Sequence, residues 1–452
     1  MSTATRERDG RSSTARVPAP SGRPGRRRGR RAEAGAVRTA PGVAPARTTL
    51  RSRPRAGHLG PFQLRQLVLI EVALALTGIG LALGGLWLVP AATVACVLVL
   101  VAVSRRRGHA VQDWLSTALA LRARTRPAEP CGPDVDPLLA PVAESVPGFR
   151  PYTYVDRNRR TVGMLGDGTF LTVVVRVEAS GDGLRPVFGA RSLPLTLLAD
   201  ALSVDDITLE SVQLVQQVRS APAPHLPQQA VARLSYAPLQ EQTGAPALRL
   251  TWVAIKLDPE LCREAVDARG GGIEGAQRCL VRVADHVASR ITGAGFRAVV
   301  LDQEELNSTV ATSACASPAL SARAGRPDAA ARRRTAETAR VWRCDDRWHT
   351  TYAVGRWPEL GRGATPLPKL VALLTSAPAY ATTFSLTLRP GAHRGTMSIG
   401  GHVRITGGSD TELVRVRRTL EQAARHAKVG LVRLDREQLP GVLATLPLGG
   451  AR

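Results

Sequence analysis

Two groups of acidic residues have the types and spacing that could do chemistry. Asp134 and Asp136 are separated by one residue, a spacing at which two carboxylates can share one divalent cation, as in sugar-nucleotide transferases. Asp345 and Asp346 are followed closely by His349, which brings together acid, base and metal-ligand types. However, the first pair lies in a Pro-rich linker, and adjacent aspartates are first of all typical of a turn. We therefore predict no catalytic residue, no cofactor and no metal at either place.

Lysine is scarce, and none of the lysines lies in a nucleotide-binding loop. Lys256, Lys369 and Lys428 follow Ile, Pro and Ala, whereas a P-loop requires Gly-Lys-Ser/Thr to place a lysine on the phosphates. The sequence also lacks HExxH, CxxC and GxSxG, the signatures of common zinc proteases, redox proteins and α/β-hydrolases. The 6 cysteines are too scattered for a metal cluster. We therefore predict that the protein is not an enzyme.

The segment 107–130 is predicted to be a juxtamembrane amphipathic helix. Its apolar residues recur at spacings of three and four, which places them on one helix face, and arginines close its C-terminal end. Such a face docks on a partner protein or lies on anionic lipid, and we favour the partner protein. The candidate partner or membrane interface consists of Val111, Trp114, Leu115, Leu119, Arg122, Arg124 and Arg126.

A long apolar run extends over residues 67–103 and contains a single acidic residue. A membrane span needs about 20 apolar residues, so a run of this length favours two spans joined by a tight turn. We therefore predict a two-helix transmembrane hairpin at 61–106, with spans at about 67–86 and 88–104. The alternative is a buried helical hairpin of a soluble domain, which rarely contains so long a charge-poor run.

Arginines flank this run on both sides, while its middle carries none. The positive-inside rule then places both termini in the cytoplasm, and the predicted localisation is the plasma (inner) membrane, as a multi-pass protein with two spans. Gly80 and Gly84 form a GxxxG, the spacing that lets helix backbones approach closely in lipid. We predict that these glycines support helix packing in the membrane.

The N-terminal segment carries much of the positive charge of this 452-residue chain, whose formal net charge is +24. Residues 1–65 hold 16 arginines against 3 acidic residues. Because residues 1–60 have almost no large apolar side chains to offset chain entropy, we predict a disordered Arg/Pro-rich cytoplasmic tail. This uneven distribution excludes a uniformly basic nucleic-acid-binding protein. We expect anionic lipid near the basic flanks and no nucleic acid.

After a Pro-rich linker at 131–150, the segment 151–452 is predicted to be a cytosolic mixed α/β domain with a flexible insert at about 316–337. Two similar α/β halves, or one domain with an insert, are both compatible with the pattern. The predicted fold class is therefore a membrane protein with a transmembrane hairpin and a cytosolic mixed α/β domain. Periodicity predicts strands at 170–177, 248–257 and 296–301, a β-hairpin turning at Asp345 and Asp346, and helices at 193–202, 273–291 and 409–427.

The order of these segments resembles that of a known family. A basic N-terminus, an apolar hairpin and an Asp-Trp-Leu helix that ends in Arg-x-Arg-x-Arg (113–126) are similar to EccE, the E component of the type VII (ESX) secretion membrane complex of actinobacteria. The resemblance extends to WRCDDRWHTTYAVGRWPEL (342–360), TSAPAYATTFSLTLRP (375–390) and DREQLPGVLATLPLGG (435–450).

This resemblance implies a non-catalytic structural subunit that assembles with EccB, EccC and EccD to export proteins across the inner membrane, with the ATPase motor in EccC. It also implies a cytosolic domain similar in outline to glycosyltransferase-like folds without a clear active site. The alternative function is a membrane-anchored glycosyltransferase-like or sugar-nucleotide-binding protein that uses Asp134 and Asp136, or Asp345 and Asp346. A third interpretation is a membrane protein whose Arg-rich tail tethers nucleic acid.

Overall fold

The fold is described from a computed structural model of the protein. The described residues all lie within Thr48–Arg452. Only the backbone is described for residues 58–59, 62–70, 83, 88, 97–103, 105–106 and 109–116. The structure describes residues 58–59, 62–85, 88–103, 105–106, 109–125, 135–179, 192–219, 229–231, 234–235, 248–326, 332–359, 366–391, 393 and 396–450.

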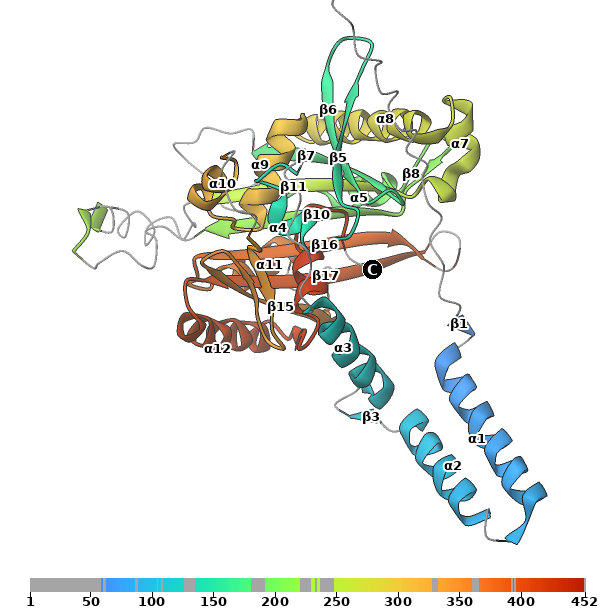
Figure 1. Ribbon diagram of the computed structural model, residues 1–452. Coiled ribbons are helices and arrows are strands. Elements are labelled where there is room, and N and C mark those ends of the chain that lie inside the picture. The colour runs from blue at the N-terminus through green and yellow to red at the C-terminus, as the bar shows by residue number, and fades with distance from the viewer. Residues whose placement is uncertain are drawn as a thin grey trace, which may run out of the picture. The chain divides into compact units, whose positions relative to one another are not determined.

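The apolar run forms two helices that lie side by side, α1 (Leu64–Leu83) and α2 (Leu88–Val103) (Figure 1). Gly84 and Gly85 follow α1 with φ of +61° and +60°. Glycine adopts this left-handed backbone without the steric cost that a Cβ atom would bring, so the two residues can end α1 and begin the turn.

The predicted transmembrane hairpin is wrong. In the part of the chain that the structure describes, no helix combines the length and the apolar character that a membrane crossing requires. With 16 residues, α2 rises about 24 Å, less than the roughly 30 Å of a bilayer core. Although α1 has 20 residues, it contains Arg65 and Glu71, and its longest charge-free stretch covers only 72–83. The same finding overturns the predicted localisation, a two-span protein of the plasma (inner) membrane with both termini cytoplasmic, because that prediction depended on these spans.

A twelve-stranded sheet contains strands from most of the described chain after residue 150. Its strands are β5 (Arg150–Val155), β6 (Thr161–Gly166), β7 (Leu171–Ala179), β10 (Ser211–Arg219), β11 (Leu248–Leu257), β12 (Phe296–Val300), β13 (Thr335–Glu337), β14 (Trp342–Cys344), β15 (Arg347–Arg356), β16 (Ala381–Pro390), β17 (Met397–Gly407) and β18 (Gly430–Arg433). The strands follow the order β13-β14-β15-β17-β16-β10-β11-β7-β6-β5, with β18 beside β15 and β12 beside β7. These pairings are all antiparallel.

The α/β part of the predicted fold class takes the form of one large antiparallel sheet with helices. The strand β10 pairs with β11 on one side and with β16 on the other, so the earlier and the later strands of the chain belong to a single sheet. Pairing between strands so distant in the sequence is a tertiary property that hydrophobic periodicity does not reveal.

Helices cover both faces of the sheet. They are α4 (Ala140–Ala143), α5 (Leu195–Asp200), the 3-10 helix η2 (Pro259–Cys262), α7 (Arg263–Ala268), α8 (Gly272–Gly293), α9 (Gln303–Ser313), α10 (Pro318–Ala324), α11 (Leu367–Thr375), α12 (Asp410–His426) and α13 (Gln438–Leu443). The helix α10 and the strand β13 lie within 316–337, the range that was predicted to be a flexible insert. Two-stranded hairpins are formed by β1 (His58–Leu59) with β2 (Phe62–Gln63), β3 (Arg105–Arg106) with β4 (His109–Ala110), and β8 (Ser203–Val204) with β9 (Ile207–Thr208).

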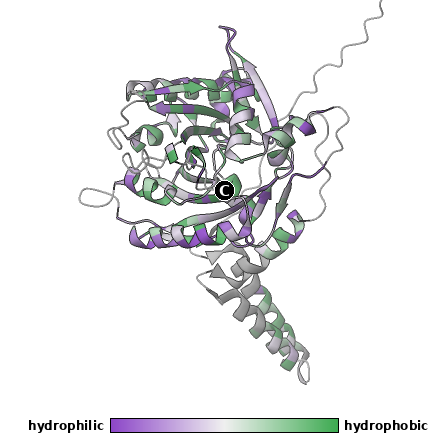
Figure 2. Ribbon diagram, turned by 90° about the vertical axis from the view of Figure 1, so that its left-hand side faces the viewer, coloured by the Kyte–Doolittle hydropathy of each residue, from purple (hydrophilic) through white to green (hydrophobic). Residues whose placement is uncertain are grey.

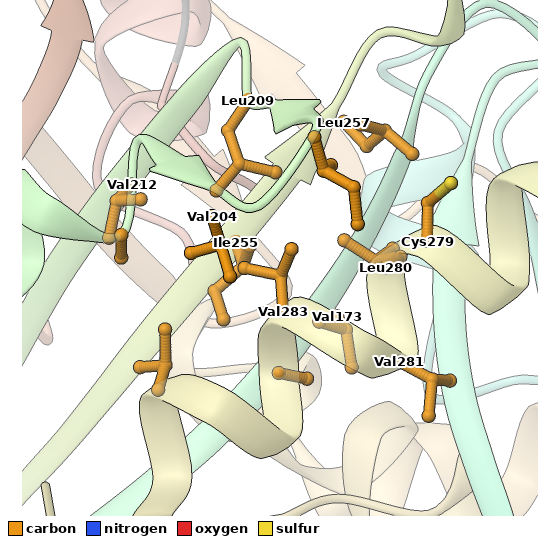
Figure 3. Close-up of a cluster of buried hydrophobic side chains, with 14 of the residues drawn as sticks. Val173, Val204, Leu209, Val212, Ile255, Leu257, Cys279, Leu280, Val281 and Val283 are labelled. Carbon is orange, nitrogen blue, oxygen red and sulfur yellow. The ribbon is translucent and has the colours of Figure 1, made fainter. Parts of the chain in front are cut away.

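One face of the sheet, here called the α8 face, is mainly apolar. Side chains alternate between the two faces of a strand, and on this face Val173, Ile255 and Phe384 are buried. Figure 3 shows Val173 and Ile255 pointing toward Leu280 and Val283 of α8. Towards β15 and β17, α11 and α12 complete this layer. The helices beside the sheet carry hydrophobic and hydrophilic residues side by side, as partly buried helices do (Figure 2).

The opposite face, here called the α13 face, is partly polar. Val174, Val215 and Trp252 are buried on it against α4, α9 and α13. The segment that follows α13 also packs here, with Leu446 and Leu448 in the same cluster. Because both faces are covered, the central strands β7 and β11 are nearly continuous in apolar residues even though their neighbours are antiparallel.

Candidate functional site

The helix α3 (Val111–Arg124) lies within the segment 107–130, where an amphipathic helix was expected. Arg122 and Arg124 lie in its last turn, where positive charge interacts favourably with the carbonyl end of the helix dipole. Three of the predicted interface residues lie in this helix, but their side chains fall outside those described: Val111, Trp114 and Leu115. The last predicted residue, Arg126, lies outside the described residues altogether.

Arg124 connects α3 to the sheet. Its Nε donates to Glu337 Oε2 at 2.8 Å, and its Nη2 donates to Glu337 Oε1 at 3.2 Å. Such a two-fold contact fixes the orientation as well as the distance of the pair. Nη2 also donates to the backbone carbonyl of Arg436 at 2.8 Å. The Glu337 side chain is only 3% exposed, and its Oε1 accepts a further hydrogen bond from the Leu439 N–H at 3.0 Å. The C-terminal end of α3 is therefore held by β13 and by the start of α13.

Leu119 is a large apolar side chain that this anchored helix presents to solvent. It is 60% exposed, and Arg122, three residues further on, is also exposed. Residues three apart lie on the same side of a helix, so the two side chains are neighbours. Leu121 is half-buried. The outer side of α3 thus combines an exposed leucine with an exposed positive charge.

Sequence reasoning grouped Arg124 with the exposed interface residues and missed its partner. The structure separates the two arginines of the last turn: Arg122 is exposed, whereas Arg124 is turned toward Glu337. No local signal could have identified this partner, since the two residues are 213 positions apart in the chain.

The two glycines predicted to pack helices together lie in different environments. Gly80 is buried within α1. Gly84 lies just beyond the end of α1, and its N–H donates to the Gly80 carbonyl at 3.2 Å. A Cβ atom at Gly84 would meet nothing within 4 Å. The structure therefore places Gly84 in the turn, where its positive φ is the requirement that glycine meets.

The three candidate side chains near the turn, Asp345, Asp346 and His349, lie in different environments. The Asp345 carboxylate is fully buried and accepts hydrogen bonds from Arg334 Nε at 2.8 Å and Arg334 Nη2 at 2.7 Å, and from the Ser317 N–H at 2.7 Å. The Asp346 side chain, in contrast, is 58% exposed. His349 is fully buried, and its Nδ1 lies 3.0 Å from Thr406 Oγ1. Burial holds the pKa of His349 well below its ordinary value, and the charges of Arg404 and Arg347 lower it further. The structure does not bring these three side chains together into one site.

Of the other acidic pair, Asp136 is described, whereas Asp134 lies outside the described residues. Asp136 Oδ1 accepts from the Leu138 N–H at 2.8 Å, and its Oδ2 accepts from Asn307 Nδ2 at 2.6 Å. Oδ1 is therefore used within the segment before α4, and Oδ2 connects that segment to α9. Across the described stretches, no three His, Cys, Asp or Glu side chains are grouped so that they could hold a metal ion.

Residues 245–354 match a family described as a type VII ESX secretion system translocon, EccE. The matched segment begins just before β11, includes α8 and α9, and ends within β15. It confirms the family resemblance that the sequence suggested. Among curated proteins, none matches the chain.

Proposed function

We propose that this chain, of which residues 245–354 match the EccE family of the type VII secretion translocon, is a non-catalytic structural subunit that docks on its neighbours through α3. EccB, EccC and EccD are the proposed partners, because the resemblance of the sequence to EccE implies them. In this role the protein contributes to the export of proteins across the inner membrane by holding the complex together.

The observation that carries the proposal is the exposure of Leu119 on a helix that is fixed to the sheet. Burying a leucine side chain contributes roughly 1.5–3 kcal/mol, and this contribution is lost while the residue stays in water. The contact between Arg124 and Glu337 holds α3 in one orientation before any partner arrives. A pre-ordered apolar residue loses little conformational freedom on binding, which favours docking.

The internal hydrogen bonds of the candidate acidic residues also support a structural role. Asp136 uses both carboxylate oxygens within the fold, and Asp345 is neutralised by Arg334. A carboxylate engaged in this way would have to break its internal hydrogen bonds to bind a cation or act as a base, which makes it a poor catalytic group. No observation favours the sugar-nucleotide alternative.

The proposal is tested with Leu119→Glu in the full chain. A charged side chain at the centre of an apolar contact should release the other core subunits when the complex is extracted in mild detergent. The measurement is the ratio of EccB, EccC and EccD to this chain after affinity purification. Leu373→Glu is the matched control, because Leu373 is an exposed leucine on a different helix, α11.

We expect Leu119→Glu to lower the recovery of the other subunits by about tenfold or more, as the loss of one buried leucine contact implies. Leu373→Glu should leave the recovery unchanged. An unaltered subunit ratio for Leu119→Glu would contradict docking through α3. Equal losses for the two variants would show that the effect is not specific to this helix.

A further inference from the structure

The α13 face contains a row of polar side chains in the middle of the sheet. Gln217, Thr383, Arg404 and Thr351 are direct cross-strand neighbours on β10, β16, β17 and β15. Each of these side chains is fully buried. Polar groups with no access to water are costly unless they find hydrogen-bond partners, so the pairing of each one matters.

Arg404 is the charged member of this row, and its charge is not compensated by a described residue. Its Nη2 donates to the carbonyl of Ser313 and to Thr383 Oγ1 at 3.3 Å. Its Nε and Nη1 have no partner, and among the described residues no carboxylate forms an ion pair with it. Burial lowers the pKa of Arg404, but a guanidinium remains protonated in proteins. Leaving a buried charge unpaired is among the more costly features that a fold can have.

Several groups beside Arg404 also lack partners within the protein. The hydroxyls of Ser313 and Thr351 make no hydrogen bond, and neither does His349 Nε2. His349 is the cross-strand neighbour of Thr406, two residues along β17 from Arg404. A neutral imidazole whose Nδ1 accepts from the Thr406 hydroxyl carries its proton on Nε2, which is then a free donor. Several hydrogen-bond donors without a partner therefore lie around the positive charge of Arg404.

We propose that this row holds a small inorganic anion of about halide size, bound by Arg404 with hydrogen bonds from Ser313, Thr351 and His349. An anion supplies what the fold lacks, because it offsets the charge and accepts from several donors at once. Water could accept hydrogen bonds but would leave the charge uncompensated. The ligand must be compact, since the side chains that would contact it are enclosed beneath α9 and α13. Nothing in the proposed role of α3 requires this site.

The test measures thermal unfolding of the full chain as chloride replaces gluconate at constant ionic strength. A ligand that binds the folded state raises the unfolding midpoint in proportion to the logarithm of one plus the ratio of ligand concentration to dissociation constant. We therefore expect a saturable rise with chloride or bromide. In Arg404→Gln, the apparent dissociation constant of chloride should increase about tenfold or more, because charge-assisted hydrogen bonds are lost.

Thr351→Val and Thr382→Val form a matched pair that keeps the test informative if Arg404→Gln does not fold. Both hydroxyls are buried and make no hydrogen bond within the protein. Thr351 is on the α13 face beside Arg404, whereas Thr382, adjacent in sequence to Thr383, lies on the opposite face of β16. Thr351→Val should weaken the response to chloride, and Thr382→Val should leave it intact.

Three outcomes would overturn the anion site. The first is an identical unfolding midpoint in chloride and in gluconate. The second is the same chloride response in Thr351→Val, Thr382→Val and the unaltered protein, which would assign the response to other basic residues. The third is a crystal grown in bromide that shows water, and no anomalous bromide peak, beside the Arg404 guanidinium.

Discussion

Asp345 and Asp346 show at the scale of single residues how packing assigns different roles to identical side chains. Asp345 is enclosed with Arg334, whose side chain is only 7% exposed, while Asp346 faces solvent. Asp345 also adopts φ of +53°, a left-handed backbone that aspartate tolerates better than most residues do. This one aspartate therefore ends β14, neutralises a buried arginine and orients the Ser317 amide.

Replacing Asp345 by Asn leaves Arg334 buried without its counter-charge. Breaking a buried ion pair from one side typically costs about 3–5 kcal/mol, and we expect Asp345→Asn to lower the free energy of unfolding by that amount. Asp346→Asn, at an exposed position, should change it by no more than about 0.5 kcal/mol. Urea unfolding of the two variants measures the difference. Similar stabilities would show that the Arg334 pair does not support the fold.

At the scale of elements, the function proposed here depends on how firmly α3 is held. The helix has 14 residues, a length at which an isolated helix is only marginally stable in water. Its connection to the sheet at Glu337 lies at its C-terminal end. The described contact thus stabilises the last turn directly, and helical cooperativity transmits that stability toward the first.

The two arginines of the last turn provide a direct test of this tether. Arg124→Gln removes the contact with Glu337, so the amides of residues 111–124 should exchange with deuterium faster, by about fivefold or more for a loss near 1 kcal/mol. Arg122→Gln makes the same chemical change on the exposed side and should leave exchange nearly unchanged. Hydrogen–deuterium exchange of peptides that cover α3 is the measurement. Equal exchange in the two variants would mean that the Glu337 contact does not order the helix.

The hydrophobic periodicity, helix caps and turn residues of the sequence predicted several elements well, because each of these features lies within a few neighbouring residues. The strand expected at 248–257 is β11, and the helix expected at 409–427 is α12, which begins with Ser409 as its N-cap. The hairpin at Asp345 is also confirmed, as β14 and β15. The order of the strands and the pairing of Arg124 with Glu337 could not be predicted, since both depend on contacts between distant segments. The spans failed for a different reason: α2 has only 16 residues, and α1 contains Arg65 and Glu71.

At the scale of the whole molecule, the end of the described chain returns to the middle of the sheet. The Ser211 hydroxyl donates to the Gly449 carbonyl at 2.6 Å, and the Gly449 N–H donates to Gln213 Oε1 at 2.8 Å. The Thr172 hydroxyl donates to the Leu448 carbonyl at 3.2 Å. The segment after α13 therefore lies across β7 and β10. Closing the fold in this way makes the stability of the central strands depend on residues more than 200 positions away.

Gly449 is the position at which this closure can be tested. Its φ is +87°, and a Cβ atom there would lie 2.5 Å from the Cβ of Lys256. We expect Gly449→Ala to cost about 1–3 kcal/mol through backbone strain, with a similar further loss from overpacking against the strand. Gly293→Ala is the matched control, because Gly293 ends α8 and a Cβ atom there would meet nothing within 4 Å. That change should be neutral or stabilise the protein by up to about 1 kcal/mol, since alanine favours the helix. Thermal and urea unfolding of both variants would decide the matter, and a Gly449→Ala protein as stable as the Gly293→Ala protein would show that the C-terminal segment is not part of the cooperative fold.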